Sequence, residues 1–171
     1  MPLVTVQPAA NESPDTGQGG LAVATPTNTG HASTSSSANG DDVGVTQTKT
    51  CRWSAFPAVA GQVAAVTLKV THATNGALSG GTATNSFALE YSTNGGGAWN
   101  TAVSRTNYGT AEGPTTFSVG LSVGQDLTAV QVRDNITAAA VASGDSASAT
   151  ATISAIQIEV TLHDSGVVGF W

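Results

Sequence analysis

The sequence predicts an all-β protein: an antiparallel β-sandwich of jelly-roll or Ig-like type that carries an extended N-terminal arm. Composition is the first observation behind this prediction, because 40% of the 171 residues are hydrophobic, 20 are glycine and only 9% are charged. The second is an alternation of apolar and polar side chains, which is typical of half-buried strands. The third is that glycine-rich turn signals separate these segments, while no helical period persists. Short strands joined by tight turns fit a sandwich.

Residues 1–44 are predicted to form the N-terminal arm. Residues 3–6 have the composition of a short strand, but three prolines and a tract rich in glycine, serine and threonine interrupt any longer element after them. An isolated chain of this composition cannot offset the entropy that it loses on ordering. We therefore expect the arm to contact neighbouring chains or to lie across its own sandwich, and we expect the sandwich to fold without residues 1–42.

A single β-sandwich domain is predicted over residues 45–163. Its strands are, in chain order, residues 47–56, 63–73, 87–92, 99–103, 116–121, 129–136 and 148–162. In the last strand the inward-facing positions shift by one residue between Ile153 and Ile156, which predicts a β-bulge at Ser154 and Ala155. Residues 138–142 are predicted to be a loop. Turn signals separate the strands at Asn75-Gly76, Gly80-Gly81, Asn94-Gly95, Gly113-Pro114, residues 124–126 and residues 143–145.

The hairpin at residues 87–103 carries the strongest local signal. Phe87, Leu89 and Tyr91 share one face of its first strand, as the alternation with smaller or polar residues indicates. Asn94-Gly95 supplies two residues that tolerate positive φ, which is what a tight hairpin turn requires. The sequence therefore predicts two antiparallel strands joined at this turn.

Within this hairpin, Ser92, Asn94, Gly96 and Trp99 have the spacing Ser-x-Asn-x-Gly-x-x-Trp. The motif resembles the Asp-box turn of sialidases and related β-proteins, with asparagine in place of aspartate. The resemblance implies a folding device in which Trp99 packs beneath its own hairpin, in the core, and it implies no chemistry. Sialidases are much longer propellers with several copies of the box, so a sialidase is not expected here.

The sequence predicts no catalytic site, no metal site and no cofactor. The three histidines, His31, His72 and His163, have no carboxylate or cysteine at the spacing of a zinc site. No phosphate loop, dinucleotide fingerprint or Gly-x-Ser-x-Gly motif is present. We therefore expect a protein that is not an enzyme. The carboxylates mostly fall on predicted turns or strand exteriors rather than converging in one cleft; those considered are Glu90, Glu112, Asp126, Asp134, Asp145 and Glu159.

Nucleic acid and membrane are not expected as partners. Only five residues are Lys or Arg, against 11 that are Asp or Glu, and they are too scattered to neutralise a phosphate backbone. Nothing in the spacing of the three arginines, Arg52, Arg105 and Arg133, suggests a shared anion site. No apolar run approaches the length of a membrane span. The first residues lack a basic segment followed by an apolar stretch, so we expect synthesis in the cytoplasm without Sec export.

The single cysteine, Cys51, cannot form a disulfide within the chain. Its strand places it on the same face as Trp53 and Ala55, which predicts a small buried core residue. An intermolecular disulfide or a reactive thiol is the alternative that the sequence leaves open.

The chain ends in an apolar tail, predicted at residues 164–171. Its apolar side chains would reduce the solubility of a free monomer whose formal net charge is only −6. We expect the tail to dock in a groove on an adjacent subunit, where aromatic anchors supply much of the interface energy. A tail folded back on its own sandwich is the alternative. The predicted interface residues are Val167, Val168, Phe170 and Trp171.

Three segments, residues 91–99, 126–133 and 150–160, together resemble jelly-roll modules in structural proteins of tailed bacteriophages and prophages. The resemblance implies a module that decorates a capsid or builds a neck, collar or fibre and carries no catalytic residues. We therefore expect a non-enzymatic virion structural protein, synthesised in the host cytoplasm. Its partners would be other virion proteins and copies of itself.

A carbohydrate-binding module is the alternative function, because similar patterns of strands and turns occur in bacterial modules of that kind. Such a module would stack exposed aromatic rings on a surface glycan. Trp53, Trp99 and Tyr108 are the candidates for that role, although the pattern places Trp53 and Trp99 in the core. The exposure of the tryptophans separates the two hypotheses. A small hydrolase is disfavoured.

Overall fold

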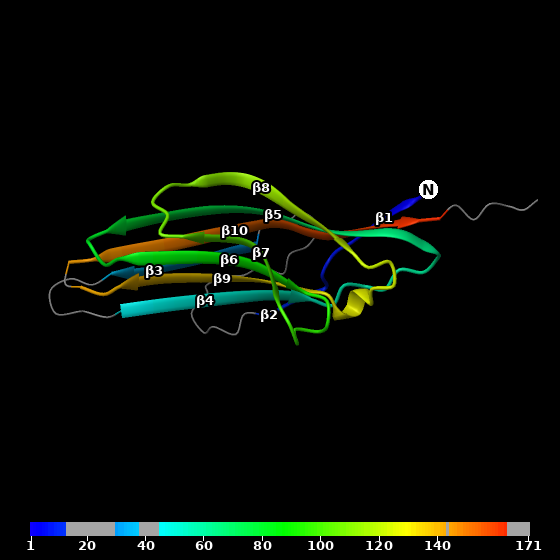
Figure 1. Cartoon of the computed structure of the whole chain (residues 1–171), viewed down its shortest axis with the longest axis horizontal. Coiled ribbons are helices and arrows are strands. Elements are labelled where there is room, and N and C mark those ends of the chain that lie inside the picture. Colours follow the sequence, from blue (N-terminus) through cyan, green and yellow to red (C-terminus); the bar gives the residue numbers. More distant parts are fainter. Residues whose placement is uncertain (13–29, 38–44, 143, 164–171) are drawn as a thin grey trace, which may run out of the picture.

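The computed structural model describes residues 1–12, 30–37, 45–142 and 144–163. These residues form two antiparallel sheets that face each other, which confirms the predicted β-sandwich (Figure 1). The first, here called the β5 sheet, contains β1 (Leu3–Val6), β3 (Gly30–Ser37), β5 (Val63–Ser79), β8 (Glu112–Leu121) and β10 (Ser146–Leu162). The second, the β9 sheet, contains β2 (Ala10–Glu12), β4 (Val45–Ser54), β6 (Thr84–Ser92), β7 (Asn100–Thr106) and β9 (Gln131–Ala140). A short 3-10 helix, η1 (Leu127–Ala129), precedes β9.

Strand order places β10 and β9 inside their sheets. The β5 sheet has the order β1-β10-β5-β8, with β3 also paired to β10, and the β9 sheet has the order β2-β4-β9-β6-β7. Strands β7 and β8 are therefore edge strands, each paired on one side only among the described strands. No helix in the described part of the chain is long and apolar enough to cross a membrane.

The core lies between the two sheets and is built by alternation along each strand. Its largest fully buried side chains come from both sheets, from the loop after β4 and from the residue between η1 and β9: Trp53, Phe56, Leu68, Val70, Phe87, Leu89, Val130, Val132, Ile136, Ile153, Ile158 and Val160. Cys51 is also fully buried and is not in a disulfide. The prediction that Cys51 and Trp53 face the core is confirmed, whereas Ala55, just past the end of β4, is exposed.

The predicted bulge in the last strand is confirmed. The register of β10 against β5 shifts between Ile153 and Ala155, which lie opposite His72 and Thr71. The extra residue lets Ile153 and Ile156 both point into the core, as both are buried.

Several predicted turns and loops are wrong because strand pairing continues through them. Strand β5 extends through Asn75-Gly76, and its ladder with β10 continues as far as Ser79 opposite Ser146. Strand β8 also includes Gly113-Pro114, where its ladder with β5 shifts register between Thr115, opposite His72, and Glu112, opposite Thr74. Gly76 permits a close approach, since a Cβ there would lie 2.7 Å from the Tyr108 ring. The predicted loop after residue 137 is also strand as far as Ala140, because β9 stays paired with β4.

The segment expected to be an arm supplies strands to both sheets. Strands β1 and β3 pair with β10, and β2 pairs with β4. In its described part this segment therefore belongs to the sandwich, and removing it would take away three strands. The predicted tail at residues 164–171 lies outside the described residues.

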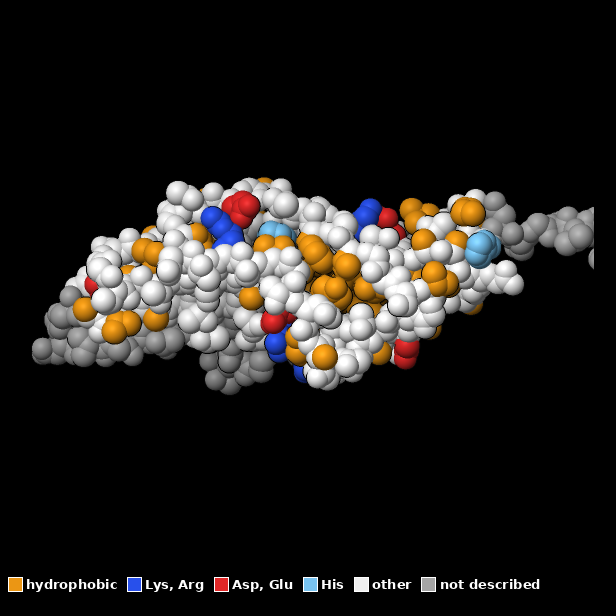
Figure 2. Space-filling model, in the orientation of Figure 1, with side chains coloured by type: hydrophobic (Ala, Val, Ile, Leu, Met, Phe, Trp, Pro, Cys, Tyr) orange, Lys and Arg blue, Asp and Glu red, His pale blue; other side chains and the backbone are white. Residues whose placement is uncertain are grey.

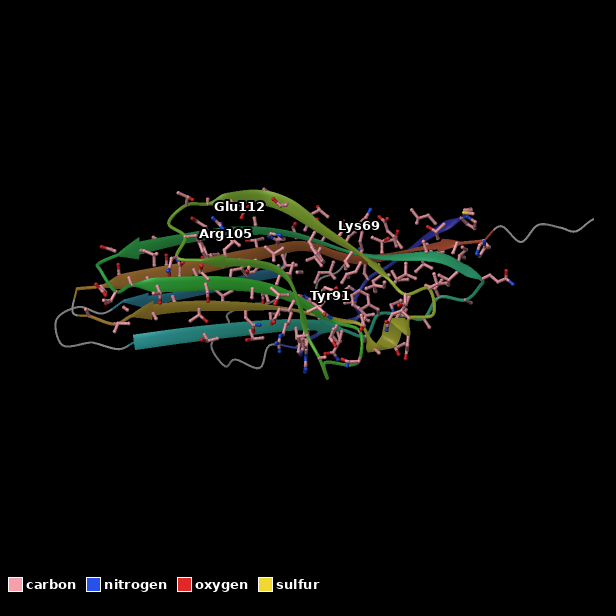
Figure 3. All side chains as sticks on the ribbon, in the orientation of Figure 1. Lys69, Tyr91, Arg105 and Glu112 are labelled. Carbon is pink, nitrogen blue, oxygen red and sulfur yellow. The ribbon has the colours of Figure 1, made fainter. Side chains whose placement is uncertain are left out.

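Strands β7 and β8 form one long side of the sandwich, here called the β7–β8 edge. Arg105 of β7 bridges the two sheets, because it bonds Thr74 of β5 and lies 3.3 Å from a Glu112 carboxylate oxygen of β8 (Figure 3). Farther along this edge, the Tyr91 and Phe117 rings meet with centroids 6.0 Å apart. Hydrophobic side chains gather in the middle of the same edge (Figure 2).

Candidate functional site

The turn of the hairpin between β6 and β7 is built by the predicted residues. The Ser92 hydroxyl accepts hydrogen bonds from the Asn94 and Gly96 amides at 3.3 and 3.0 Å and donates one to Asn94 Oδ1 at 2.8 Å. Asn94 Oδ1 in turn accepts from the Ala98 amide at 2.9 Å. Gly95 and Gly96 have φ of 71° and 88°, in the left-handed region that favours glycine. These contacts fix the direction in which the chain enters β7.

Trp99 does not lie in the core, so this prediction is wrong. Asn100 pairs with Tyr91, which points toward the core, so the residue before Asn100 faces the same side as Ser92 and Glu90. That side is the outer face of the β9 sheet. Trp99 is half-buried there, and its ring lies 4.0 Å from the Arg133 guanidinium carbon.

A chain of hydrogen bonds holds Arg133 in place under Trp99. Arg133 Nε donates to Glu90 Oε2 at 2.7 Å, and Asn135 Nδ2 donates to the same oxygen at 2.5 Å. The Thr50 hydroxyl donates to Asn135 Oδ1 at 2.7 Å. The Glu90 and Arg133 side chains are only 16% and 30% exposed, so their pair is partly shielded from water. The network links β4, β9 and β6 across the outer face.

Arg52 completes the arrangement from the next strand. It lies directly opposite Arg133 in the ladder between β4 and β9, so both arginines belong to the same face. A hollow of about 330 Å³, here called the Trp99 hollow, is lined by Thr50, Arg52, Gly96, Trp99 and Arg133. The hollow combines an aromatic surface, two guanidinium groups and a hydroxyl, which are groups that bind polar ligands rather than groups that break bonds.

The other aromatic candidates for sugar binding are buried. Trp53 is 1% exposed and Tyr108 is 5% exposed, so neither can stack on a ligand at the surface. The predicted interface residues in the tail lie outside the described residues. Among the candidates with a described position, only Trp99 has an accessible ring.

One carboxylate lies where the sequence analysis did not expect it. Asp134 was expected among exterior carboxylates, but it points into the core from β9 and is fully buried. Its Oδ1 accepts from the Cys51 amide at 3.0 Å, and its Oδ2 has no hydrogen-bond partner among the described residues. Burial raises the pKa of Asp134 to about 7. Burial, followed by the nearby Asp134 charge, raises the pKa of the Cys51 thiol to about 12, so the thiol is protonated and inert at neutral pH.

The described residues contain no cluster of three or more histidine, cysteine or acidic side chains that could hold a metal ion. His72 is buried against Phe87, with ring centroids 5.7 Å apart, and burial lowers its pKa. Comparisons with protein-family models, with curated proteins and with solved structures find no match for this chain. Its function must therefore be argued from the geometry.

Sequence reasoning missed the Arg52–Arg133 pairing and the network around Glu90. The alternation in β9 did predict that Arg133 faces outward. Alternation within one strand does not report which strands lie beside it. The contact between Arg133 and Glu90, which are 43 residues apart, could therefore not be predicted. The Asp-box-like motif was the one local signal that pointed to this place.

Proposed function

We propose that the chain is a non-enzymatic structural protein of a tailed-phage virion, and that it works by attachment to other virion proteins and to copies of itself. Capsid decoration, a neck or collar, and a tail accessory component are the roles that its family resemblance implies. The β-sandwich fold is compatible with each of them. The proposal concerns a scaffold whose surfaces, rather than a catalytic centre, carry the function.

The β7–β8 edge is the observation that carries this proposal. Two edge strands lie on the same side of the sandwich, and each has backbone groups on its outer side that are unpaired among the described strands. The inward-facing side chains of β8 and the neighbouring Tyr91 are only partly buried, although they pack against the core. A second copy of the chain that docks along this edge would cover them.

The test is a charge placed on this edge. Phe117→Glu puts a carboxylate among the partly buried side chains, and Ser118→Glu puts one on the opposite, exposed face of the same strand. We expect the first variant to lose self-association in light scattering while the second retains it, with both showing unchanged β-sheet circular dichroism. Equal association of both variants, or a monomeric parent chain, would contradict the role of this edge.

The C-terminal tail is the second attachment element that we propose, on the evidence of its sequence alone. Val167, Val168, Phe170 and Trp171 would anchor the chain to an adjacent subunit. Removing residues 167–171 should lower the occupancy of the protein on purified particles without changing its fold. Full occupancy without these residues would show that the tail has another role.

A second candidate function is carbohydrate binding, and the half-buried position of Trp99 favours it. An accessible indole beside polar groups is the arrangement with which binding modules stack on sugar rings. Trp99→Ala should abolish binding to a glycan array if this function is correct. Binding that is unchanged in Trp99→Ala would reject the Trp99 hollow as the site.

A further inference from the structure

The two strands of the β7–β8 edge differ in how well they resist pairing with another strand. Proteins usually block an edge strand with a bulge, a proline or an inward-pointing charged side chain. Strand β7 has two of these features. Its ladder with β6 shifts register between Leu89 and Glu90, which leaves Ala102 as an extra residue. Arg105 points inward from the same strand and bonds Thr74 of β5. Strand β7 is therefore poorly suited to a further ladder.

Strand β8 lacks such features over most of its length. Its register shift and Pro114 both lie near its start. Over residues 115–121, here called the regular part of β8, the ladder with β5 has no shift, and residues 113–125 include no charged side chain. Strand β8 is also the outermost strand of its sheet, with no further strand beside it in the described part of the chain (Figure 1). The regular part of β8 is therefore open to another strand.

The composition of the regular part of β8 favours strand pairing. Threonine, phenylalanine and valine are typical strand residues, and the segment contains neither proline nor charge. On its inner side, Phe117, Val119 and Leu121 pack against the core but are only partly buried. On its outer side, Thr116 and Ser118 are exposed. A strand added here would satisfy unpaired backbone groups and would also cover the inner side chains.

A second copy of β8 is the partner that fits this edge. In a contact about a twofold axis each copy presents the same surface, so that β8 meets its own residues in the antiparallel direction. Like charges opposite each other would weaken such a ladder, and an uncharged segment avoids them in every register. A twofold axis perpendicular to the sheet also keeps the inner faces of both sheets on one side. There the second copy would cover the Tyr91 and Phe117 rings, whose centroids lie 6.0 Å apart.

We propose that the regular part of β8 pairs in the antiparallel direction with the same segment of a second copy, so that two β5 sheets join into one. This inference rests on the self-association proposed for the β7–β8 edge, and it names the strand that mediates it. Because a twofold contact uses the same surface on both copies, the assembly closes at two chains. Strand β7 takes no part in the ladder between the copies.

Hydrogen–deuterium exchange measures this pairing in the full-length protein. Samples are compared at concentrations below and above the onset of self-association in light scattering. Backbone amides of β8 that point away from β5 gain carbonyl acceptors only in the pair, so their exchange should slow at least about tenfold on association. Exchange in β7, the internal control, should stay the same, and the associated species should have the mass of two chains.

Chemical cross-linking gives a matched pair of variants. Ser118 of β8 and Ser104 of β7 are both exposed, whereas the native thiol of Cys51 is fully buried. A short bismaleimide should therefore link Ser118→Cys into a dimer and leave Ser104→Cys monomeric. Ser118→Glu remains compatible with the pairing, because Lys69 lies directly opposite Ser118 on β5 and offsets the added charge.

The other outcomes separate the inference from the function on which it rests. Self-association that slows exchange in β7 and links Ser104→Cys, with β8 unchanged, would overturn the inference but leave self-association along the β7–β8 edge in place. Slowed exchange in β8 at a mass above two chains would overturn the twofold arrangement. Self-association that leaves both strands unchanged, or a parent chain that stays monomeric, would overturn both the inference and the role of this edge. Circular dichroism of each variant verifies that it is folded.

Discussion

Both faces of the β9 sheet pair a tryptophan with a nearby carboxylate, in very different surroundings. On the inner face, Trp53 and Asp134 are buried among apolar side chains, and Asp134 has one oxygen without a partner in the described structure. On the outer face, Trp99 lies against Arg133, and Glu90 accepts two hydrogen bonds at one oxygen. The same residue types therefore take part in apolar packing on one face and in a partly solvated network of polar contacts on the other.

This difference shows how a single alternation along β4 and β9 separates a buried apolar face from a polar face that is partly exposed to water. Inward positions contribute by removing apolar surface from water, so that their energies are large. Outward positions interact in a medium that is partly water, so that their energies are small and their side chains can exchange one partner for another. A binding site on the outer face can thus change while the core remains the same.

The largest effect should separate the two tryptophans. Trp53→Ala is expected to lower the free energy of unfolding by about 3–5 kcal/mol, because it empties a fully buried aromatic site. Trp99→Ala should cost about 1 kcal/mol or less, the value of a partly exposed cation–π contact. Urea unfolding followed by circular dichroism measures both. Equal losses would mean that Trp99 has a core role after all.

The second effect concerns the two carboxylates and pH. The folded-state pKa of Asp134, about 7, lies above its ordinary value of 3.8, so the folded protein holds this proton more tightly than the unfolded chain does. Protonation of Asp134 therefore stabilises the folded state. This contribution to the free energy of unfolding is fully present below about pH 4 and is lost as the pH rises to about 7. With about 1.4 kcal/mol per pKa unit, the loss amounts to as much as about 4 kcal/mol.

Asp134→Asn should remove this contribution, since the amide cannot ionise. We expect the variant to be more stable than the parent at pH 8 and to differ little from it at pH 4, in urea unfolding at both pH values. Glu90→Gln, on the outer face of the same sheet, is the control and should keep the slope of the parent. A slope between pH 4 and 7 that persists in Asp134→Asn would assign it to another group.

The alternation of residue types predicted the inner face well. It placed Cys51, Trp53, Ile153 and Ile156 facing the core, and all four are buried. Asp134 lies two residues from both Val132 and Ile136, so it shares their face and is buried with them, although it had been grouped with carboxylates expected mostly on turns or strand exteriors. At this position the fold departs from the usual preference of charged side chains for the surface.

The outer face could be predicted only in part, because its contacts depend on which strands are neighbours. Arg133 and Arg52 meet through the β4–β9 ladder, and no local pattern reports that pairing. The orientation of Trp99 depends on the pairing of Asn100 with Tyr91, and the register of this hairpin shifts beyond Glu90. Turn signals also failed where a long ladder could continue, as in β5.

A third, smaller effect should come from the glycine that shapes the Trp99 hollow. Gly96 has φ of 88°, and a Cβ there would lie 2.9 Å from Gln131 Oε1. Gly96→Ala should therefore cost about 1–2 kcal/mol through backbone strain and should also displace the Gln131 side chain. Gly120→Ala is the control, since its Cβ would meet nothing within 4 Å. Equal changes in melting temperature in both variants would show that Gly96 has no special role in shaping the Trp99 hollow.

The smallest effect should distinguish the two ion pairs on the outer faces of the two sheets. Arg133–Glu90 and Lys69–Glu159 have a similar design, because each carboxylate also accepts from an amide, that of Asn135 or of Gln157. The first pair is less exposed, at 30% and 16% against 35% and 22%. Double-mutant cycles should give a coupling of about 0.5–1 kcal/mol for Arg133–Glu90 and about 0.2–0.5 kcal/mol for Lys69–Glu159. Added salt should reduce the second coupling more than the first, because water and ions reach it more easily. The reverse order would mean that Trp99 does not shield the Arg133–Glu90 pair from solvent.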